Sequence, residues 1–418
     1  MEFLLFIPFI VLLLSIAIMP FLAPSWWHKN YGKFSILLAL FMVLFYLIAL
    51  KKNDEVIKTA EEYISFICLL GSLYTVSGGI YFVIKGKATP FKNTLTLFIG
   101  SVIANFFGTT GAAMLLIRPY MNSNKNRLKP YHIVFFIFTV CNTGGALTPI
   151  GDPPLFLGYL KGVPFFWIIG NLYYIWFFTL LYILLIFYII DKYNYEKLRR
   201  DARSRIEEKG EEFEFRGLYN IIFLLIIIAS VFITKPIFVR EALMIFCAVA
   251  SYRLTPREVH RKNKFNFEPI KEVALLFIGI FMTMMPVLNY LSKNAEDLNI
   301  KTPGEFYWVA GFLTSFLDNA PTYLNFLTMA MGLEHLNIYN PNEVLLFLDK
   351  FKIYVISISV SSVFFGAMTY IGNGPNFMVK SIAENKGVKM PAFFTYIYKY
   401  SLPILIPAFF VIWYIFFR

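Results

Sequence analysis

Two aspartates in apolar, helix-breaking segments are the strongest candidates for chemistry in this chain. Asp152 lies within residues 148–154 (T-P-I-G-D-P-P) and Asp318 within residues 315–322 (S-F-L-D-N-A-P-T). An ionisable side chain inside a membrane costs roughly 2.5–3.5 kcal/mol on insertion scales and marks a functional site by default. The alternative for each aspartate is a helix N-cap, where a carboxylate accepts hydrogen bonds from free backbone amides. The occurrence of both at similar breaks favours a binding site.

Hard oxygen and amide donors accompany the two aspartates. They are Thr109, Thr110, Asn142, Thr143, Thr148, Gly151, Asn319, Asn373 and Asn376, with Gly151 contributing opened backbone. Carbonyl and carboxylate oxygens suit small hard cations, so Asp152 and Asp318 are candidate ligands for sodium. Burial and a neighbouring like charge also favour the protonated form of a carboxyl group. These groups could therefore exchange protons for a cation, although mutual hydrogen bonding explains any single Thr or Asn equally well.

The segment that holds Asp152 recurs in the second half of the chain. Residues 145–156 read G-A-L-T-P-I-G-D-P-P-L-F, and residues 366–377 read G-A-M-T-Y-I-G-N-G-P-N-F, at an offset of about 221. Gly and Pro at this density interrupt a helix. Interrupted segments at matching positions of two halves indicate the central binding site of a transporter. Asp152 is matched by Asn373.

Further matches follow in the same order along the chain. Residues 105–116 align with 315–326, Glu62 aligns with Glu272, and the tripeptide K-G-V occurs at 161–163 and 386–388. Segments 93–120 and 303–332 are too long for one span and have polar, helix-breaking centres. We expect each to be a re-entrant hairpin; the alternative is a single kinked helix.

Composition places the chain in a membrane. Hydrophobic residues make up 58% and charged residues 15% of 418 positions. Apolar stretches of about 20 residues, enough to cross a bilayer, recur along it. The expected spans are 2–22, 34–50, 62–84, 132–161 (broken), 165–190, 218–233, 236–252, 270–292, 344–381 (broken) and 391–417. The N-terminal run starts Met1-Glu2 and lacks a cleavage pattern, so a signal peptide is not expected.

Charge sets the expected orientation and the boundary between the halves. Cations gather in loops 85–92, 121–130, 191–217 and 253–268, which the positive-inside rule places in the cytoplasm. Both termini then lie outside the cytoplasm, and the location is the inner (cytoplasmic) membrane, with several crossings. The charged linker 191–217 separates residues 1–190 from 218–418 and is expected to be a solvated helix or loop.

An odd number of crossings per half inverts the second half relative to the first. The expected fold is therefore all-α and integral to the membrane, with two inverted five-helix repeats, each containing a re-entrant hairpin and a broken helix. Residues 1–190 form the first repeat and residues 218–418 the second. Arg240 and Glu241 are adjacent in one helix, so we do not expect them to face each other.

Several classes of function are not expected. The three cysteines and four histidines form no ligand spacing, so a metal or redox enzyme and a resident cofactor are not predicted. The net charge of +12 resides in the loops, and no motif for nucleic-acid binding accompanies it. Arg118 and Lys380 are expected at the cytoplasmic boundary, where long cations reach water.

In these residues and their order, the chain resembles the ion transporter superfamily, which includes NhaD-type sodium/proton antiporters, citrate and divalent-anion symporters, and arsenite permeases. The resemblance rests on residues 148–154, 315–322 and 369–376 and covers essentially the whole chain. It implies a homodimer and elevator-type movement of a transport domain against a scaffold. The Ser-Asn-Thr signatures of dicarboxylate carriers are absent from both hairpin tips, whereas Asp152-Pro153-Pro154 departs from the Asp-Val-Thr-Thr of the antiporter branch.

Together these patterns predict a secondary active transporter, not an enzyme, that exchanges sodium for protons. The alternative is a sodium-coupled symporter of citrate or another small dicarboxylate. The expected partners are sodium ions, protons, the lipid bilayer and a second copy of the chain.

Overall fold

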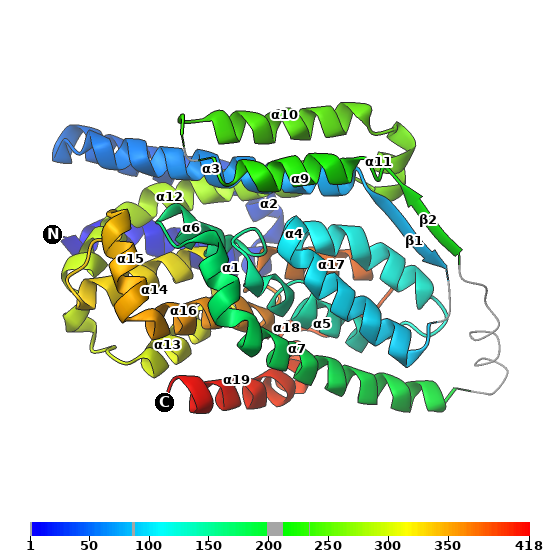
Figure 1. Ribbon diagram of the computed structural model, residues 1–418. Coiled ribbons are helices and arrows are strands. Elements are labelled where there is room, and N and C mark those ends of the chain that lie inside the picture. The colour runs from blue at the N-terminus through cyan, green and yellow to red at the C-terminus, as the bar shows by residue number, and fades with distance from the viewer. Residues whose placement is uncertain (1, 86–87, 199–211, 234) are drawn as a thin grey trace.

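The computed structural model describes residues 2–85, 88–198, 212–233 and 235–418 (Figure 1). The protein is an all-α, multi-pass membrane protein. Six of its described helices are long and apolar enough to cross a membrane, or seven if one bent pair counts as a span. The described elements of residues 1–217 are η1 (Glu2–Phe6), α1 (Ile7–Leu22), α2 (Pro24–Leu44), η2 (Phe45–Leu50), α3 (Asn53–Gly78), β1 (Tyr81–Lys85), α4 (Pro90–Ser123), α5 (Pro130–Thr139), η3 (Thr143–Leu147), α6 (Pro153–Leu160), α7 (Phe165–Glu196) and β2 (Glu212–Arg216).

The second half, like the first, contains long helices, a segment that folds back on itself and an interrupted helix. Its elements are α9 (Asn220–Ser230), α10 (Val239–Leu254), α11 (Arg257–Asn263), α12 (Glu268–Lys293), η4 (Ala295–Leu298), α13 (Pro303–Phe316), α14 (Asn319–Leu333), α15 (Pro341–Lys350), α16 (Lys352–Phe364), η5 (Phe365–Met368), α17 (Gly374–Glu384), α18 (Phe393–Tyr396), η6 (Ile397–Ser401) and α19 (Leu402–Phe416). Ten spans were expected, whereas six or seven described helices meet the length and hydropathy needed to cross a membrane; α9, for example, is shorter.

The helices form two groups by their packing, and in Figure 1 helices α3, α9 and α10 of the first group run along the top of the view, above α4, α5 and α7 of the second. The framework helices are α1, α2, α3, α9, α10 and α12. The hairpin module comprises α4 to α7 and α13 to α19. At the centre of the framework, the ring of Phe66 on α3 stacks on that of Phe277 on α12, with 4.8 Å between ring centroids. The hydroxyl of Ser35 on α2 donates to the carbonyl of Leu276 at 3.1 Å, which fixes α2 against α12.

Both long polar-centred segments fold back on themselves. A straight helix of the 34 residues of α4 would be about 50 Å long. Instead the chain turns at Gly108 (φ 72°, ψ 157°), and Asn93 and Asn124 at its two ends exchange side-chain hydrogen bonds of 2.8 and 2.9 Å. In the second half, the rings of Phe306 on α13 and Phe326 on α14 lie 6.0 Å apart across the break. Hairpins, not kinked single helices, occupy both places.

The two interrupted helices have the same local structure. In α5–η3–α6, a Cβ on Gly151 would lie 2.1 Å from the carbonyl oxygen of Gly145; in α16–η5–α17, one on Gly372 would lie 2.7 Å from that of Gly366. Only glycine permits this backbone approach. The residues that follow the two turns, Asp152 and Asn373, are extended, with φ/ψ of −144°/143° and −153°/139°.

Three local expectations differ from the structure. Residues 81–85, expected at the end of a span, form β1, which pairs antiparallel with β2, so residues 212–216 of the charged linker form a strand rather than a helix or loop. The aromatic and β-branched run Y-F-V-I-K favours a strand once Gly78-Gly79 has ended the helix. At the other end of the linker, residues 191–196 continue α7, so that part is helical as expected. The expected broken span 344–381 begins with a separate helix, α15, bent by 96° from the next one. Linker residues 199–211 lie outside the described residues.

Arg240 and Glu241 do contact each other, contrary to expectation. Their side chains lie 2.7 Å apart because both turn toward Ser65 on α3, whose hydroxyl donates to Glu241 Oε1 at 2.6 Å and accepts from Arg240 Nη2 at 2.8 Å. A tertiary contact thus brings together neighbours that helix geometry alone would separate.

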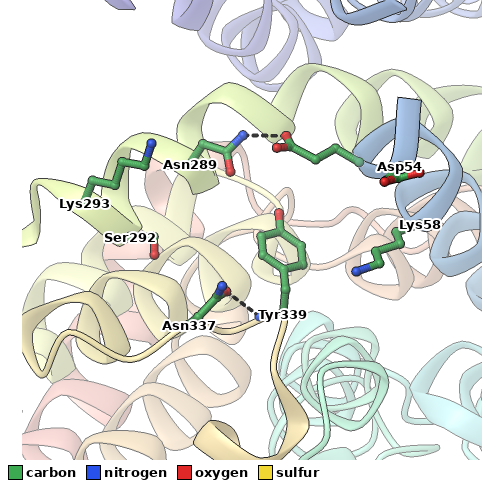
Figure 2. A pocket seen from close by; sticks show the side chains of 8 residues that line it. Asp54, Lys58, Asn289, Ser292, Lys293, Asn337 and Tyr339 are labelled. Atoms are coloured by element: carbon green, nitrogen blue, oxygen red, sulfur yellow. Dashed lines mark hydrogen bonds between the residues drawn. The ribbon is translucent and has the colours of Figure 1, made fainter. Parts of the chain in front are cut away.

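A cavity of 230 Å³ opens between the start of α3, the end of α12 and the chain after α14 (Figure 2). Glu55, Lys58, Lys293 and Tyr339 are among its lining residues. Within it, the Asn289 side chain donates to Glu55 Oε2 at 2.7 Å. The cavity lies between the framework helices and the hairpin module.

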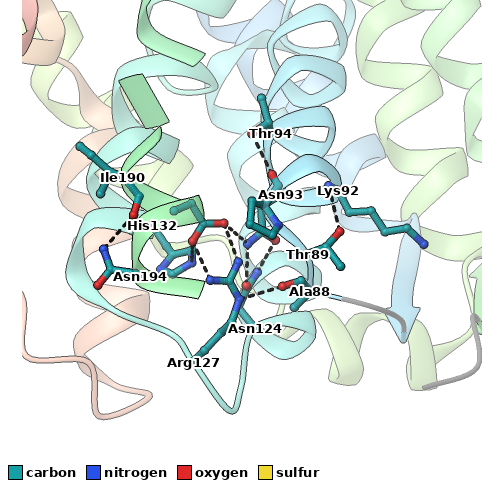
Figure 3. A network of polar contacts seen from close by, with 12 residues as sticks. Ala88, Thr89, Lys92, Asn93, Thr94, Asn124, Arg127, His132, Ile190 and Asn194 are labelled. Carbon is teal, nitrogen blue, oxygen red and sulfur yellow. Dashed lines mark hydrogen bonds and ion pairs between the residues drawn. The ribbon is translucent and has the colours of Figure 1, made fainter. Parts of the chain in front are cut away.

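A buried polar network closes the open end of the α4 hairpin (Figure 3). The Arg127 guanidinium binds both carboxylate oxygens of Asp191 at 2.7 and 2.5 Å and donates from Nε to the carbonyl of Ala88 at 2.7 Å. Tyr131 and Asn93 also donate to Asp191, at 2.6 and 3.0 Å. Arg127 is therefore not a solvated loop cation, and α7 holds the hairpin base in place.

Candidate functional site

The Asp152 carboxylate is buried at the point where both halves of the chain meet. It lies between Gly151, which closes the turn, and Pro153, which begins α6. Its Oδ1 accepts from the Thr109 hydroxyl at 2.7 Å and from the Asn373 amide at 3.0 Å. Its Oδ2 accepts from the Asn319 amide at 2.6 Å. It makes no capping bond to α6, so side chains from both hairpins and the other broken helix hold it.

Asp318 lies at the tip of the second hairpin but makes a different kind of contact. Its carboxylate caps α14 by accepting from the backbone N–H of Ala320 at 3.0 Å, and the residue is only half-buried. The N-cap alternative therefore describes the observed bond of Asp318 and not that of Asp152. Asp318 directly precedes Asn319, whose amide donates to Asp152 Oδ2.

Asparagines join the two broken helices behind Asp152. Asn142 donates to Asn376 Oδ1 at 2.7 Å, and Asn376 donates in turn to the carbonyls of Gly366 and Thr369 at 2.8 and 3.0 Å. Asn373 also donates to the Cys141 carbonyl at 3.0 Å. These bonds align the two interruptions, so the three asparagines position the site.

The threonines fall into two groups. Thr109 contacts Asp152 directly, and its backbone N–H donates to the carbonyl of Gly151 at 2.8 Å. Thr148 builds the turn: its hydroxyl donates to the Asn105 carbonyl at 2.6 Å and accepts from the backbone N–H of Gly151 at 3.0 Å.

Thr143 is buried at the start of η3 and Thr110 is half-buried in α4. Among the hydrogen bonds of the described residues, none joins either side chain to the Asp152 carboxylate. The structure therefore places both near the turns without giving them a contact at the carboxylate.

The second half repeats the turn built by Thr148. Thr369 donates to the Ser315 carbonyl at 2.5 Å and accepts from the backbone N–H of Gly372 at 3.1 Å. Asn105 and Ser315 thus anchor equivalent turns, although neither stood out as a site residue in the sequence. Their 105–116 to 315–326 alignment was the signal that could have identified them.

An unpaired oxygen lies beside the buried carboxylate. In the described structure, Asn319 Oδ1 is buried without a hydrogen-bond partner, while its Nδ2 is bonded to Asp152. A buried polar atom without a partner is costly unless a ligand or water satisfies it. Carboxylate, amide carbonyl and hydroxyl oxygens together form a donor set suited to a hard cation.

No positive side chain compensates the carboxylate. In the described part of the chain, no ion pair involves Asp152 or Asp318, and no group of three or more His, Cys, Asp or Glu residues could hold a metal ion. A buried, unpaired carboxylate is unfavourable as a free anion. The site can therefore gain stability by binding either a proton or a cation.

A multi-span helical protein with a polar centre at two interrupted helices belongs to the class of membrane transport proteins. The family model CitMHS_2, described as "Putative citrate transport", matches residues 1–417. The chain belongs to this family, and it is a secondary transporter rather than an enzyme. No curated protein sequence matches it.

Proposed function

We propose that the protein exchanges sodium ions for protons across the membrane, with Asp152 as the group that binds each in turn. The single observation that carries this proposal is a fully buried carboxylate held only by neutral donors from both halves of the chain. Such a group competes for a proton or a cation, because either one neutralises it.

The neighbouring groups give each ion a place. Sodium would have the Asp152 carboxylate and the unpaired Asn319 Oδ1 as oxygen ligands, with Thr109 Oγ1 next to them. A proton would occupy the carboxylate itself. Asp318, half-buried at the adjacent tip, would add negative charge that attracts the cation toward the site.

We further infer that the two halves are inverted repeats and that the hairpin module moves against the framework helices in an elevator-type mechanism. The matching turns at Gly151 and Gly372 support the repeat. Odd numbers of crossings per half, both termini outside the cytoplasm and a homodimer complete the proposal. Movement of the module would expose Asp152 to one side at a time.

A second candidate, sodium-coupled uptake of citrate or a related carboxylate, is favoured by the description of the family. The amides of Asn319 and Asn373 and the hydroxyl of Thr109 could donate to substrate carboxylates. In that case Asp152 would need a bound cation, because it would otherwise repel the anionic substrate.

The two candidates differ in what crosses the membrane. Protein reconstituted in vesicles would be tested by following internal pH after sodium is added, and then by measuring labelled citrate uptake. Sodium-driven proton movement that is lost in Asp152→Asn and Asp318→Asn variants supports exchange. Citrate uptake that requires sodium, without proton countertransport, would overturn it.

A further inference from the structure

An ion pair joins the hairpin module to the framework on one side of the protein. Lys161, at the end of α6, places its ammonium 2.6 Å from Glu62 Oε1 on α3. The Lys161 side chain is 3% exposed and that of Glu62 is 20% exposed. The same ammonium lies 4.3 Å from the centre of the Tyr339 ring. This desolvated pair connects two groups of helices that the proposed function requires to move.

Neighbouring contacts close the same side. The Tyr159 hydroxyl on α6 donates to the carbonyl of Val231 after α9 at 2.7 Å, which is a second bond between module and framework. Tyr339, which covers Lys161, also lines the cavity of Figure 2. Tyr339 therefore links the Glu62–Lys161 pair to that cavity.

Lys161 has a structural equivalent in the second half, Lys386. Both precede a glycine with positive φ, Gly162 at 112° and Gly387 at 83°. Both helix ends make the same capping bonds. The Val163 N–H donates to Gly158 and the Val388 N–H to Ala383, five residues back in each case, at 3.0 and 3.1 Å. The K-G-V tripeptides thus end α6 and α17 in the same way.

Glu62 likewise has an equivalent in Glu272. Helices α3 and α12 cross at Phe66 and Phe277, which differ by 211 in residue number. Close to that crossing, the Tyr63 hydroxyl donates to the carbonyl of Ala274 at 2.9 Å. The offset of 210 residues that relates Asn105 to Ser315 in the two matching turns also relates Glu62 on α3 to Glu272 on α12.

The equivalent residues do not meet in this structure. Lys386 is exposed and donates to Asn122 Oδ1 at 2.5 Å, and Glu272 is exposed on α12. Although Lys386 is exposed, partial desolvation of its ammonium by neighbouring residues lowers its pKa, and the nearby charges of Arg118 and Lys264 lower it further. Lys386 thus lies among like charges on the side where its carboxylate counterpart is open to solvent.

We propose that Glu272 and Lys386 form a second positioning ion pair that replaces Glu62–Lys161 when the site opens to the opposite side. In inverted repeats, the contacts of one half in one state are those of the other half in the opposite state. If one ion pair breaks as the other forms, the two conformations stay similar in free energy, which conversion between them requires. This inference rests on the proposed transport function, and it assigns these four residues to positioning rather than to ion binding.

Cysteine crosslinking in the full-length protein tests the proposal, with Cys68, Cys141 and Cys247 replaced by serine or alanine. One variant carries Glu62→Cys and Lys161→Cys, and the second carries Glu272→Cys and Lys386→Cys. Both pairs should form a disulfide or a mercury bridge, detected by peptide mass. The matched control combines Lys271→Cys with Lys386→Cys, because Lys271 is exposed next to Glu272 but points away from its face of the helix.

Charge reversal provides a second measurement that does not depend on crosslinking. Glu272→Lys should slow ion exchange at least about fivefold, and the combination with Lys386→Glu should restore it. Absence of a crosslink at 272/386, in protein that crosslinks at 62/161 and transports ions, would overturn the proposal. If both pairs crosslink but the vesicles move neither sodium, protons nor citrate, the proposed function fails while the alternating pairs stand.

Discussion

Replacing Asp152 by Asn should abolish ion exchange while leaving the fold intact. The new amide oxygen can still accept from Thr109 and Asn373, as Oδ1 does at 2.7 and 3.0 Å. The new amide nitrogen would face the Asn319 nitrogen, which now lies 2.6 Å from Oδ2. Because Asn319 Oδ1 has no partner in the described structure, a flip of its amide restores that bond.

The Asp152→Asn substitution should weaken sodium binding far more than it destabilises the fold. The cost to the free energy of unfolding should not exceed one hydrogen bond, about 0.5–1.5 kcal/mol. Loss of the charge removes an attraction of about 4 kcal/mol for a cation at about 4 Å, or roughly a thousandfold in sodium affinity. Asp152→Ala differs, since it leaves the donors of Thr109 and Asn319 buried without their acceptor at about 1–3 kcal/mol each, while Asn373 keeps its bond to the Cys141 carbonyl.

Two measurements check this prediction. Thermal unfolding in detergent should place Asp152→Asn near the wild type and Asp152→Ala well below it. Sodium-driven pH change in vesicles should be absent from both variants. Exchange at the wild-type rate by Asp152→Asn would refute the assignment of Asp152 as the ion-binding group, whatever its effect on stability.

Three further substitutions test the framework of the site. Asp191→Asn should lower the free energy of unfolding by about 3–5 kcal/mol in chemical denaturation, because Arg127 would stay buried without its carboxylate. An unchanged denaturation midpoint would contradict a stabilising role for the Arg127–Asp191 ion pair. Gly151→Ala should impair both folding yield and transport, since its Cβ would meet a carbonyl at 2.1 Å, whereas Gly374→Ala, with open space around it, should behave as wild type. Thr369→Val should cost about 1–3 kcal/mol in thermal unfolding by leaving a buried N–H and a carbonyl unpaired, and wild-type stability would argue against the turn described here.

Much of the fold follows from local sequence. Runs of apolar residues fix the membrane helices, the first hairpin turns at Gly108, and Asp318 caps the helix that begins after the turn of the second. The repeat also located both turns, since glycine is required where Gly151 and Gly372 approach other backbone atoms. The strand at residues 81–85 was missed because its partner lies beyond the charged linker, and pairing between distant segments leaves no local periodicity.

The sequence alone determined that the chain is a helical membrane protein with two interrupted helices and acidic groups at the breaks. Only the tertiary structure decided that Asn319 and Asn373 close on Asp152, that Asp318 instead caps its own helix, and that Lys161 reaches Glu62. The physical reason is the separation along the sequence over which each effect acts. Helix propensity and hydropathy act over a few residues, whereas the contacts of Asp152 and Lys161 join positions about 100 to 220 residues apart and depend on how whole helices pack.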